Sequence, residues 1–188
     1  MLQTIAERIR AEKSKVIVID GMAASGKSTA AMLLSNELNA SVIHMDDFFL
    51  PAELRNPKRF EQAGGNVHYE RFFDEVVTKL KGDSPILYRP FDCHSMDYKA
   101  EIKQPCGEIV IIEGCYAMHP YFGKYWDLAL FFKVDPAVQN SRILQRNGEA
   151  MLAMFQRRWI PLEQNYFDKC HTEEKADMVI NGELLDLR

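Results

Sequence analysis

A short segment of the chain combines glycine, lysine and serine at a spacing that suits phosphate binding. From Gly21 to Ser28 it reads GMAASGKS, which fits the Walker A pattern G-x-x-x-x-G-K-[ST]. The glycines permit backbone turns that aim successive N–H groups inward, a catalytic Lys27 can reach the β and γ phosphates, and Ser28 can ligate magnesium. We therefore expect ATP and Mg²⁺ to bind here, and a glycine-rich turn without a ligand is the alternative. The predicted nucleotide contacts are Gly21, Ala23, Ala24, Ser25, Gly26, Lys27, Ser28 and Thr29.

Acidic residues follow two of the apolar segments. Asp46 and Asp47 come directly after one such segment, and Glu113 is the last residue of another. At the C-terminal edge of a parallel sheet, a carboxylate can accept the proton of a substrate hydroxyl and contact a water of the magnesium ion. We predict that Asp46 is this general base. The predicted metal ligands are Ser28, Asp46 and Glu113. The alternatives are that the Asp pair only caps a loop or helix and that Glu113 ends a strand in water.

Arginines are concentrated in one later segment. Arg142 and Arg146 lie four positions apart, so on a helix they share a face, and Arg157 and Arg158 follow them. Two arginines on one face suit a lid that closes over a triphosphate and neutralises charge in the transition state. We predict a helical lid at about residues 136–162 with Arg142 and Arg146 as catalytic residues. A solvated basic face is the alternative.

These side chains need a scaffold that positions them, and the chain alternates short β-branched segments with longer amphipathic ones. This alternation predicts a parallel sheet covered by helices. The first strand, Lys15–Asp20, has a continuous apolar centre, as a strand buried on both faces should have. The other predicted strands are 41–45, 108–113, 126–134 and 176–180. The predicted helices are 27–38, 70–80 and 136–167, the last interrupted at Gly148.

Two long polar segments that contain proline and glycine break this alternation, at about residues 51–66 and 88–107. Long irregular loops in a compact domain are usually functional. We therefore expect these two loops to hold the second substrate.

Size and composition limit the class of protein. The chain has 188 residues, 47% hydrophobic and 27% charged, which predicts one globular domain over residues 1–188. Lys and Arg number 23 against 27 Asp and Glu, and the net charge of −4 gives no reason to expect nucleic acid or an anionic membrane as a partner. No apolar run approaches the ~20 residues that a membrane helix needs.

The N-terminal segment and the cysteines bear on the expected compartment. The first fifteen residues carry charges throughout and do not resemble an export signal. The four cysteines show no C-x-x-C pairing, which predicts reduced thiols in a cytoplasmic protein. They are Cys93, Cys106, Cys115 and Cys170.

The Walker A segment does not define the fate of the triphosphate. A GTPase needs an Asn-Lys-x-Asp motif, which this sequence lacks, and motor or transporter ATPases are usually larger. A small-molecule kinase is therefore the economical hypothesis.

Three segments together resemble the uridine kinase-like group of P-loop kinases, which includes uridine-cytidine kinase, nicotinamide riboside kinase, phosphoribulokinase and bacterial pantothenate kinase. They are the Walker A segment, HMDDFFLP at 44–51 and IIEG at 111–114. The resemblance covers residues 16–180. It implies a three-layer α/β/α sandwich with a five-stranded parallel sheet in the order 2-3-1-4-5 and a mobile lid. The 44–51 segment is similar to that of nicotinamide riboside kinase, in which the first acid is the base, and this favours Asp46. The lid arginines of the family map best to Arg142 and Arg146.

The chain departs from this family where the acceptor should bind. In the nucleoside kinases an Asn-aromatic-Asp stretch supplies a carboxylate for the ribose hydroxyls, whereas here Asn66-Val67 is followed by His68. A neutral imidazole cannot replace a bidentate acid on a diol, although Glu70 or Asp92 could substitute for it. The segment 88–94 resembles the hairpin that covers the nucleobase in uridine kinases, with an extra arginine. The predicted acceptor contacts are Asp47, Phe49, His68, Asp92 and His94.

The sequence thus predicts an ATP- and Mg²⁺-dependent kinase that phosphorylates a hydroxyl of a small metabolite, with a nucleoside as the favoured acceptor. One alternative is a nucleotide-binding regulatory module without acceptor chemistry, which the His68 departure suggests. Another is a nucleoside monophosphate kinase, in which Arg55, Lys58 and Arg59 would contact the acceptor phosphate. A homo-oligomer is compatible with each of these hypotheses.

Overall fold

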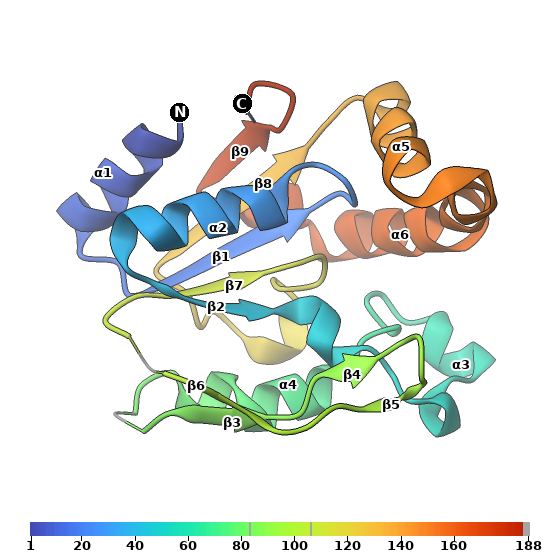
Figure 1. The fold of residues 1–188 in the computed structure, drawn as a ribbon, viewed down its shortest axis with the longest axis horizontal. Helices are drawn as coiled ribbons and strands as arrows, with labels where there is room; N and C mark the ends of the chain where they lie inside the picture. Colours follow the sequence, from blue (N-terminus) through green and yellow to red (C-terminus); the bar gives the residue numbers. More distant parts are fainter. Residues whose placement is uncertain (83, 106, 186–188) are drawn as a thin grey trace.

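The computed structural model describes residues 1–82, 84–105 and 107–185. Within these residues the central element is a parallel sheet of five strands in the order β2-β7-β1-β8-β9 (Figure 1). The strands are β1 (Val16–Gly21), β2 (Ser41–His44), β7 (Val110–Glu113), β8 (Leu128–Lys133) and β9 (Met178–Asn181). Numbered along the chain within this sheet, the order is 2-3-1-4-5, as the family resemblance implied.

The central strand of the sheet is β1. Every residue from Val16 to Gly21 is buried, and Ile17 lies opposite Ile111 on one neighbour and Leu128 on the other. Its apolar centre explains this position, because a strand covered on both faces contacts water nowhere along its length. The strand ends at Gly21, so the Walker A segment leaves the sheet at its C-terminal edge.

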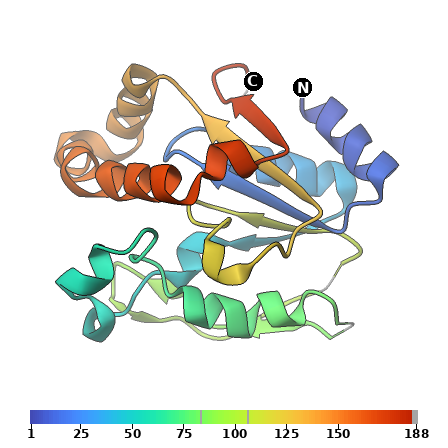
Figure 2. The same cartoon turned by 180° about the vertical axis from the view of Figure 1, so that it is seen from behind.

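Helices cover both faces of the sheet (Figures 1 and 2). On one face lie α1 (Leu2–Glu12) and α2 (Lys27–Leu38), whose apolar residues pack with Ile17 and Ile19. On the other face lie α4 (Tyr69–Glu75) and α6 (Ile160–Cys170), whose aromatic residues pack with Val18. This is the predicted three-layer α/β/α sandwich.

Helix α1 is absent from the sequence-based prediction. Its buried residues Ile5, Ala6 and Ile9 recur at the spacing of one helix face. This periodicity already indicated a helix that packs on the sheet. The sequence analysis used the charges of this segment only to judge whether it resembles an export signal.

The segment predicted as a helical lid is helical almost throughout. It comprises α5 (Pro136–Met154), a π-helical turn η5 (Phe155–Trp159) and α6, and the short helix α7 (Thr172–Lys175) follows. Gly148 interrupts α5 with φ 79° and ψ 173°, as its position in the sequence suggested. The helix continues to Cys170, beyond the predicted end at Phe167.

Other boundaries differ more. The predicted helix 70–80 divides into α4 and a 3₁₀ turn, η3 (Val77–Lys79), and Met45 begins the 3₁₀ turn η1 (Met45–Phe48) instead of ending β2. The two segments predicted as irregular contain short elements. These are η2 (Ala52–Leu54), α3 (Pro57–Phe60), β3 (Ile86–Tyr88), β4 (Phe91–Asp92), β5 (Asp97–Tyr98) and β6 (Ile102–Gln104), while η4 (Pro120–Phe122) follows β7. Strand β3 pairs with β6, and β4 pairs with β5.

The structure also bears on membrane insertion and on the cysteines. In the part of the chain that it describes, no helix is both long and apolar enough to span a bilayer. Cys93, Cys115 and Cys170 are free thiols, and Cys106 lies outside the described residues.

Candidate active site

The Walker A segment forms the loop between β1 and α2. Gly21 has φ 129°, and a Cβ at this position would lie 2.0 Å from the carbonyl oxygen of Phe132 on β8. Gly26 has φ 99° and directly precedes Lys27, the first residue of α2. Both positions therefore require glycine. The loop delivers the chain to the N-terminus of α2, where unpaired N–H groups and the helix dipole favour an anion.

A cavity of about 200 Å³ lies at this loop. It is lined by residues 24–29 together with Arg142 and Arg146 of α5, so six of the eight predicted nucleotide contacts lie together with both predicted lid arginines, while Gly21 and Ala23 do not line the cavity. Arg142 also donates hydrogen bonds to the carbonyl oxygens of Ala24 and Gly182, each at 3.1 Å. Arg142 therefore joins the lid helix to the phosphate loop, whereas Arg146 is exposed to solvent.

Lys27 lies at the floor of the loop. Only 8% of the residue is exposed, and its Nζ donates hydrogen bonds to the carbonyl oxygens of Gly21 at 2.8 Å and Met22 at 2.7 Å. The loop itself thus holds the ammonium group beside the N–H groups that would surround a phosphate.

Ser28 and Glu113 meet across the sheet edge. The Ser28 hydroxyl donates to Glu113 Oε2 at 3.2 Å, and His44 Nδ1 contacts Glu113 Oε1. The hydrogen bond to Glu113 raises the pKa of His44 despite its partial burial. A hydroxyl and a carboxylate oxygen are ligands that suit Mg²⁺, which usually completes its shell with water and substrate phosphates. Among the described residues no group of three His, Cys, Asp or Glu side chains could hold a metal ion by itself.

Asp46 lies in η1, close to this pair, and remains accessible to solvent. Surrounding protein atoms nevertheless desolvate its carboxyl group, and together with the negative charge of Glu113 this raises the pKa of Asp46, while Lys27 acts in the opposite direction. Within the described residues its side chain makes no hydrogen bond. An accessible carboxylate of raised pKa beside Lys27 has the properties that a general base needs.

Asp47 and Phe49 make side-chain and backbone contacts that Asp46 does not make. Asp47 Oδ2 accepts a hydrogen bond from the Tyr88 hydroxyl at 3.1 Å, and burial followed by the charge of Asp47 raises the pKa of Tyr88. Phe49 is half-buried and forms a bridge with Val67. Both residues therefore join the η1 segment to the acceptor-side loops.

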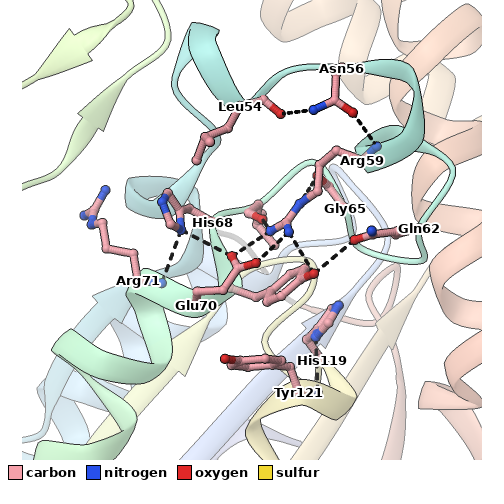
Figure 3. Close-up of polar contacts among 12 residues, drawn as sticks. Leu54, Asn56, Arg59, Gln62, Gly65, His68, Glu70, Arg71, His119 and Tyr121 are labelled. Carbon is pink, nitrogen blue, oxygen red and sulfur yellow. Dashed lines mark hydrogen bonds and ion pairs between the residues drawn. The ribbon is translucent and has the colours of Figure 1, made fainter.

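The His68 departure has a structural explanation (Figure 3). His68 caps α4, because its Nδ1 accepts a hydrogen bond from the N–H of Arg71 at 3.2 Å, and it lies 3.3 Å from Glu70 Oε2. Glu70 in turn accepts two hydrogen bonds from the Arg59 guanidinium, at 2.6 and 2.7 Å. Arg59 also lies 3.8 Å from the centroid of the Tyr69 ring. The Arg59 guanidinium thus binds the Glu70 carboxylate, while the His68 imidazole bonds to the backbone of α4.

An aromatic stack continues this cluster. Tyr69 stacks on His119 with 4.5 Å between ring centroids, and His119 Nε2 lies 2.9 Å from the carbonyl oxygen of Ala63. Burial lowers the pKa of His119 to about 4, so this imidazole is neutral near pH 7. The stack fixes the 51–66 loop against the segment that follows β7.

Asp92 and His94 lie on the β4–β5 hairpin. Asp92 Oδ1 accepts a hydrogen bond from the N–H of His94 at 2.9 Å, and this bond lowers the pKa of Asp92. His94 is exposed. The hairpin therefore presents one half-buried carboxylate and one exposed imidazole.

Two buried carboxylates near the phosphate loop were missed by the sequence analysis. The first is Asp20, which is fully buried and accepts hydrogen bonds from the Tyr166 hydroxyl at 2.7 Å and from the N–H groups of Gly21, Tyr116 and Met118. Its position directly before the Walker A glycine was a visible signal. Asp20 fixes the end of β1 to α6 and to the segment after β7.

The second is Glu163 on α6, for which the sequence holds no motif. Its Oε2 accepts a hydrogen bond from the N–H of Ala23 at 3.0 Å, and only 7% of the residue is exposed. Glu163 therefore belongs to the site although it is 140 positions from Ala23 along the chain.

Comparisons with solved structures define the fold. The chain is similar to a possible uridine kinase from Bacillus stearothermophilus, with a TM-score of 0.73 and 21% identity over 95% of this chain and 96% of that one. It is also similar to a candidate fructose transport system kinase from Silicibacter sp. TM1040, with a TM-score of 0.74 and 22% identity over 96% of this chain and 98% of that one. The sequence matches no protein-family model and no curated protein. The chain therefore shares the fold of these two proteins, in agreement with the fold that the family resemblance implied.

Proposed function

We propose that the protein is an ATP- and Mg²⁺-dependent kinase that transfers the γ phosphate to a hydroxyl group of a small metabolite. The observation that carries this proposal is the convergence of Lys27, Asp46 and the Ser28–Glu113 pair at one edge of the sheet. A phosphate-binding loop, a metal-binding pair and an accessible base are the parts that direct phosphoryl transfer requires.

Each residue has a distinct role in this proposal. The loop N–H groups and Lys27 bind the phosphates, and Ser28 with Glu113 holds Mg²⁺, which neutralises phosphate charge when bound. Asp46 orients the acceptor hydroxyl and takes its proton. Arg142 and Arg146 line the phosphate cavity from the lid helix and stabilise charge that develops during transfer.

The acceptor side favours a small neutral molecule. The two similar structures are named as a possible uridine kinase and as a candidate fructose transport system kinase, and neither name refers to a phosphorylated acceptor. A nucleoside remains the favoured acceptor, and Asp92 is the acid best placed to replace the missing ribose carboxylate, since Arg59 already pairs with Glu70. The same pairing argues against a nucleoside monophosphate as the acceptor, because Glu70 already neutralises Arg59, one of the basic residues proposed for that role.

A panel of acceptors tests the proposal. ADP release from MgATP is measured with uridine, cytidine, nicotinamide riboside, fructose, pantothenate and uridine monophosphate, for the wild type and for Asp46→Asn. We expect one of the neutral hydroxyl compounds to stimulate release in the wild type and not in the variant. ATP binding without stimulation by any acceptor would favour the regulatory module, and stimulation by the monophosphate alone would favour the monophosphate kinase.

A further inference from the structure

Glu163 brings a negative charge to the phosphate loop from the helix layer opposite α2. It lies in the first turn of α6, and its carboxylate accepts the hydrogen bond from Ala23 N–H. In a Walker A loop the backbone N–H groups are the groups that bind phosphate. The buried carboxylate of Glu163 therefore occupies an N–H group of the kind that would otherwise bind a phosphate oxygen.

The carboxylate lies at the end of the loop where transfer takes place. The phosphate cavity is lined from Ala24 onward and does not include Ala23. The charges of Lys27 and Asp46 both act on Glu163. Because these two residues would contact the γ phosphate and the acceptor hydroxyl, Glu163 is nearer to the terminal phosphate than to those beside α2.

The position of this charge is fixed. The carbonyl oxygen of Ala23 accepts a hydrogen bond from Gln139 Nε2 at 3.1 Å, so the backbone at Ala23 is held by α5 as well as by α6. Gln139 is only 2% exposed. Burial, with the added effect of Asp46 and Asp20, raises the pKa of Glu163 to about 7, although Lys27 and the Ala23 hydrogen bond act in the opposite direction. Glu163 is therefore about half ionised near pH 7 and mostly ionised at pH 8.

We propose that Glu163 sets the preference of the phosphate loop between diphosphate and triphosphate. Anchored on Ala23, its carboxylate opposes the γ phosphate and leaves the α and β phosphates nearly unaffected. The inference rests on the proposed kinase function. A repulsion confined to the transferred group is relieved as that group moves to the acceptor, so it weakens binding of the substrate more than binding of the transition state.

The test compares two affinities in the full-length protein. Dissociation constants of MgADP and of the Mg²⁺ complex of β,γ-imido-ATP are measured by calorimetry at pH 8 for the wild type, Glu163→Gln and Glu163→Asp. Glu163→Gln removes the charge and keeps an acceptor for Ala23 N–H, whereas Glu163→Asp keeps the charge. Glu174→Gln on α7, whose side chain is 78% exposed, controls for a general change of charge. Glu163→Leu is a second neutral variant in case the glutamine disturbs α6.

At pH 8 a carboxyl with a pKa of about 7 can escape repulsion by taking up a proton, so we expect Glu163→Gln to bind the triphosphate analogue about tenfold more tightly and MgADP less than about threefold more tightly. Glu163→Asp and Glu174→Gln should keep the wild-type ratio of the two affinities. Equal changes for both nucleotides, or weaker binding of the analogue, would overturn the role of Glu163 and leave the kinase proposal intact. Failure of the wild type to bind either nucleotide would overturn both.

Discussion

The donor side and the acceptor side of the site are built in different ways. On the donor side, the phosphate loop, Lys27 and Ser28 are consecutive in the chain and leave N–H groups and a cavity available to a ligand. On the acceptor side, charged groups bind one another, as Arg59 of α3 and Glu70 of α4 do, and His68 bonds to the backbone of α4. The donor side therefore keeps groups free to bind a triphosphate, whereas on the acceptor side many charged groups are already paired with each other.

This difference shows which part of the function is general and which is specific. A triphosphate always presents the same phosphates, so a local motif suffices to bind it. An acceptor is recognised by the few polar groups that remain after the loops have paired internally. In this protein Asp46 and Asp92 are such groups, since neither has a side-chain partner as close as the one that Glu70 has in Arg59.

The largest effect is expected where the two sides meet. Asp46→Asn should reduce turnover at least about 10²-fold, because a general base typically contributes ~10²- to 10⁴-fold. Affinity for MgATP should remain nearly unchanged, since the cavity is lined by other residues. Turnover under saturating MgATP and acceptor, with calorimetric titration of MgATP, measures both quantities.

Asp47→Asn is the matched control for this prediction. Asp47 accepts a hydrogen bond from Tyr88 and an asparagine can still accept it, so turnover should fall less than about tenfold. Equal losses in the two variants would mean that the pair acts as a unit and that Asp46 is not the sole base.

The next effect concerns the charge that α6 adds to the donor side. The pKa of Glu163 is raised to about 7 in the folded protein, whereas an unfolded glutamate titrates near ~4.3, so the unfolded chain loses this proton first. The carboxyl therefore lowers stability as pH rises from about 4.3 through 7. Relative to the wild type, Glu163→Gln should gain up to about 3 kcal/mol in its free energy of unfolding between pH 5 and pH 8.

Urea unfolding of both proteins at several pH values measures this difference. The neighbouring charges that face Glu163, namely Lys27 on α2, Asp46 in η1 and Asp20 on β1, are common to both proteins and largely cancel in the comparison. A difference that stays constant from pH 5 to pH 8 would show that Glu163 titrates as an ordinary glutamate.

Features that depend on a short stretch of the chain could be predicted from the sequence, as the phosphate loop was. The apolar centre of β1, the Walker A segment and the break at Gly148 are local features, and the structure confirms the buried strand and the interrupted helix that they implied. The strand order, which the structure also confirms, was implied by the family resemblance. The periodicity of Ile5, Ala6 and Ile9 was equally local, so α1 was within reach of the same reasoning although the prediction did not include it.

Tertiary partners could not be predicted in this way. Nothing in the sequence around Glu163 indicates that it contacts Ala23, because that contact depends on how α6 packs beneath the loop. Nor does the sequence show that His68 caps α4 while Glu70 is bound by Arg59. Glu70 and Asp92 looked equally available in the sequence, and only the fold shows that Arg59 binds Glu70 at 2.6 Å while the nearest basic side chain to Asp92 is Lys99 at 3.8 Å.

Glu70→Gln tests whether the acceptor side is held together by its own charges. Arg59 is only 14% exposed, so it would lose its carboxylate partner in a largely buried place, and we expect the free energy of unfolding to fall by about 1–2 kcal/mol. Glu12→Gln is the control, because its pair with Arg8 is exposed and should contribute less than about 0.5 kcal/mol. Urea unfolding measures both. A large rise in acceptor KM without loss of stability would instead assign Glu70 to the acceptor.

The smallest effect is expected at the tip of the acceptor side. His94 is exposed, and its N–H rather than its ring bonds Asp92, so His94→Ala should change the free energy of unfolding by less than about 0.5 kcal/mol. If the imidazole contacts the acceptor, KM for the acceptor should rise about threefold to tenfold with kcat nearly unchanged, because such an interaction stabilises the ground state and the transition state equally. An unchanged KM would show that the His94 imidazole does not contact the acceptor. Recognition would then depend on Asp92 and on residues outside the hairpin.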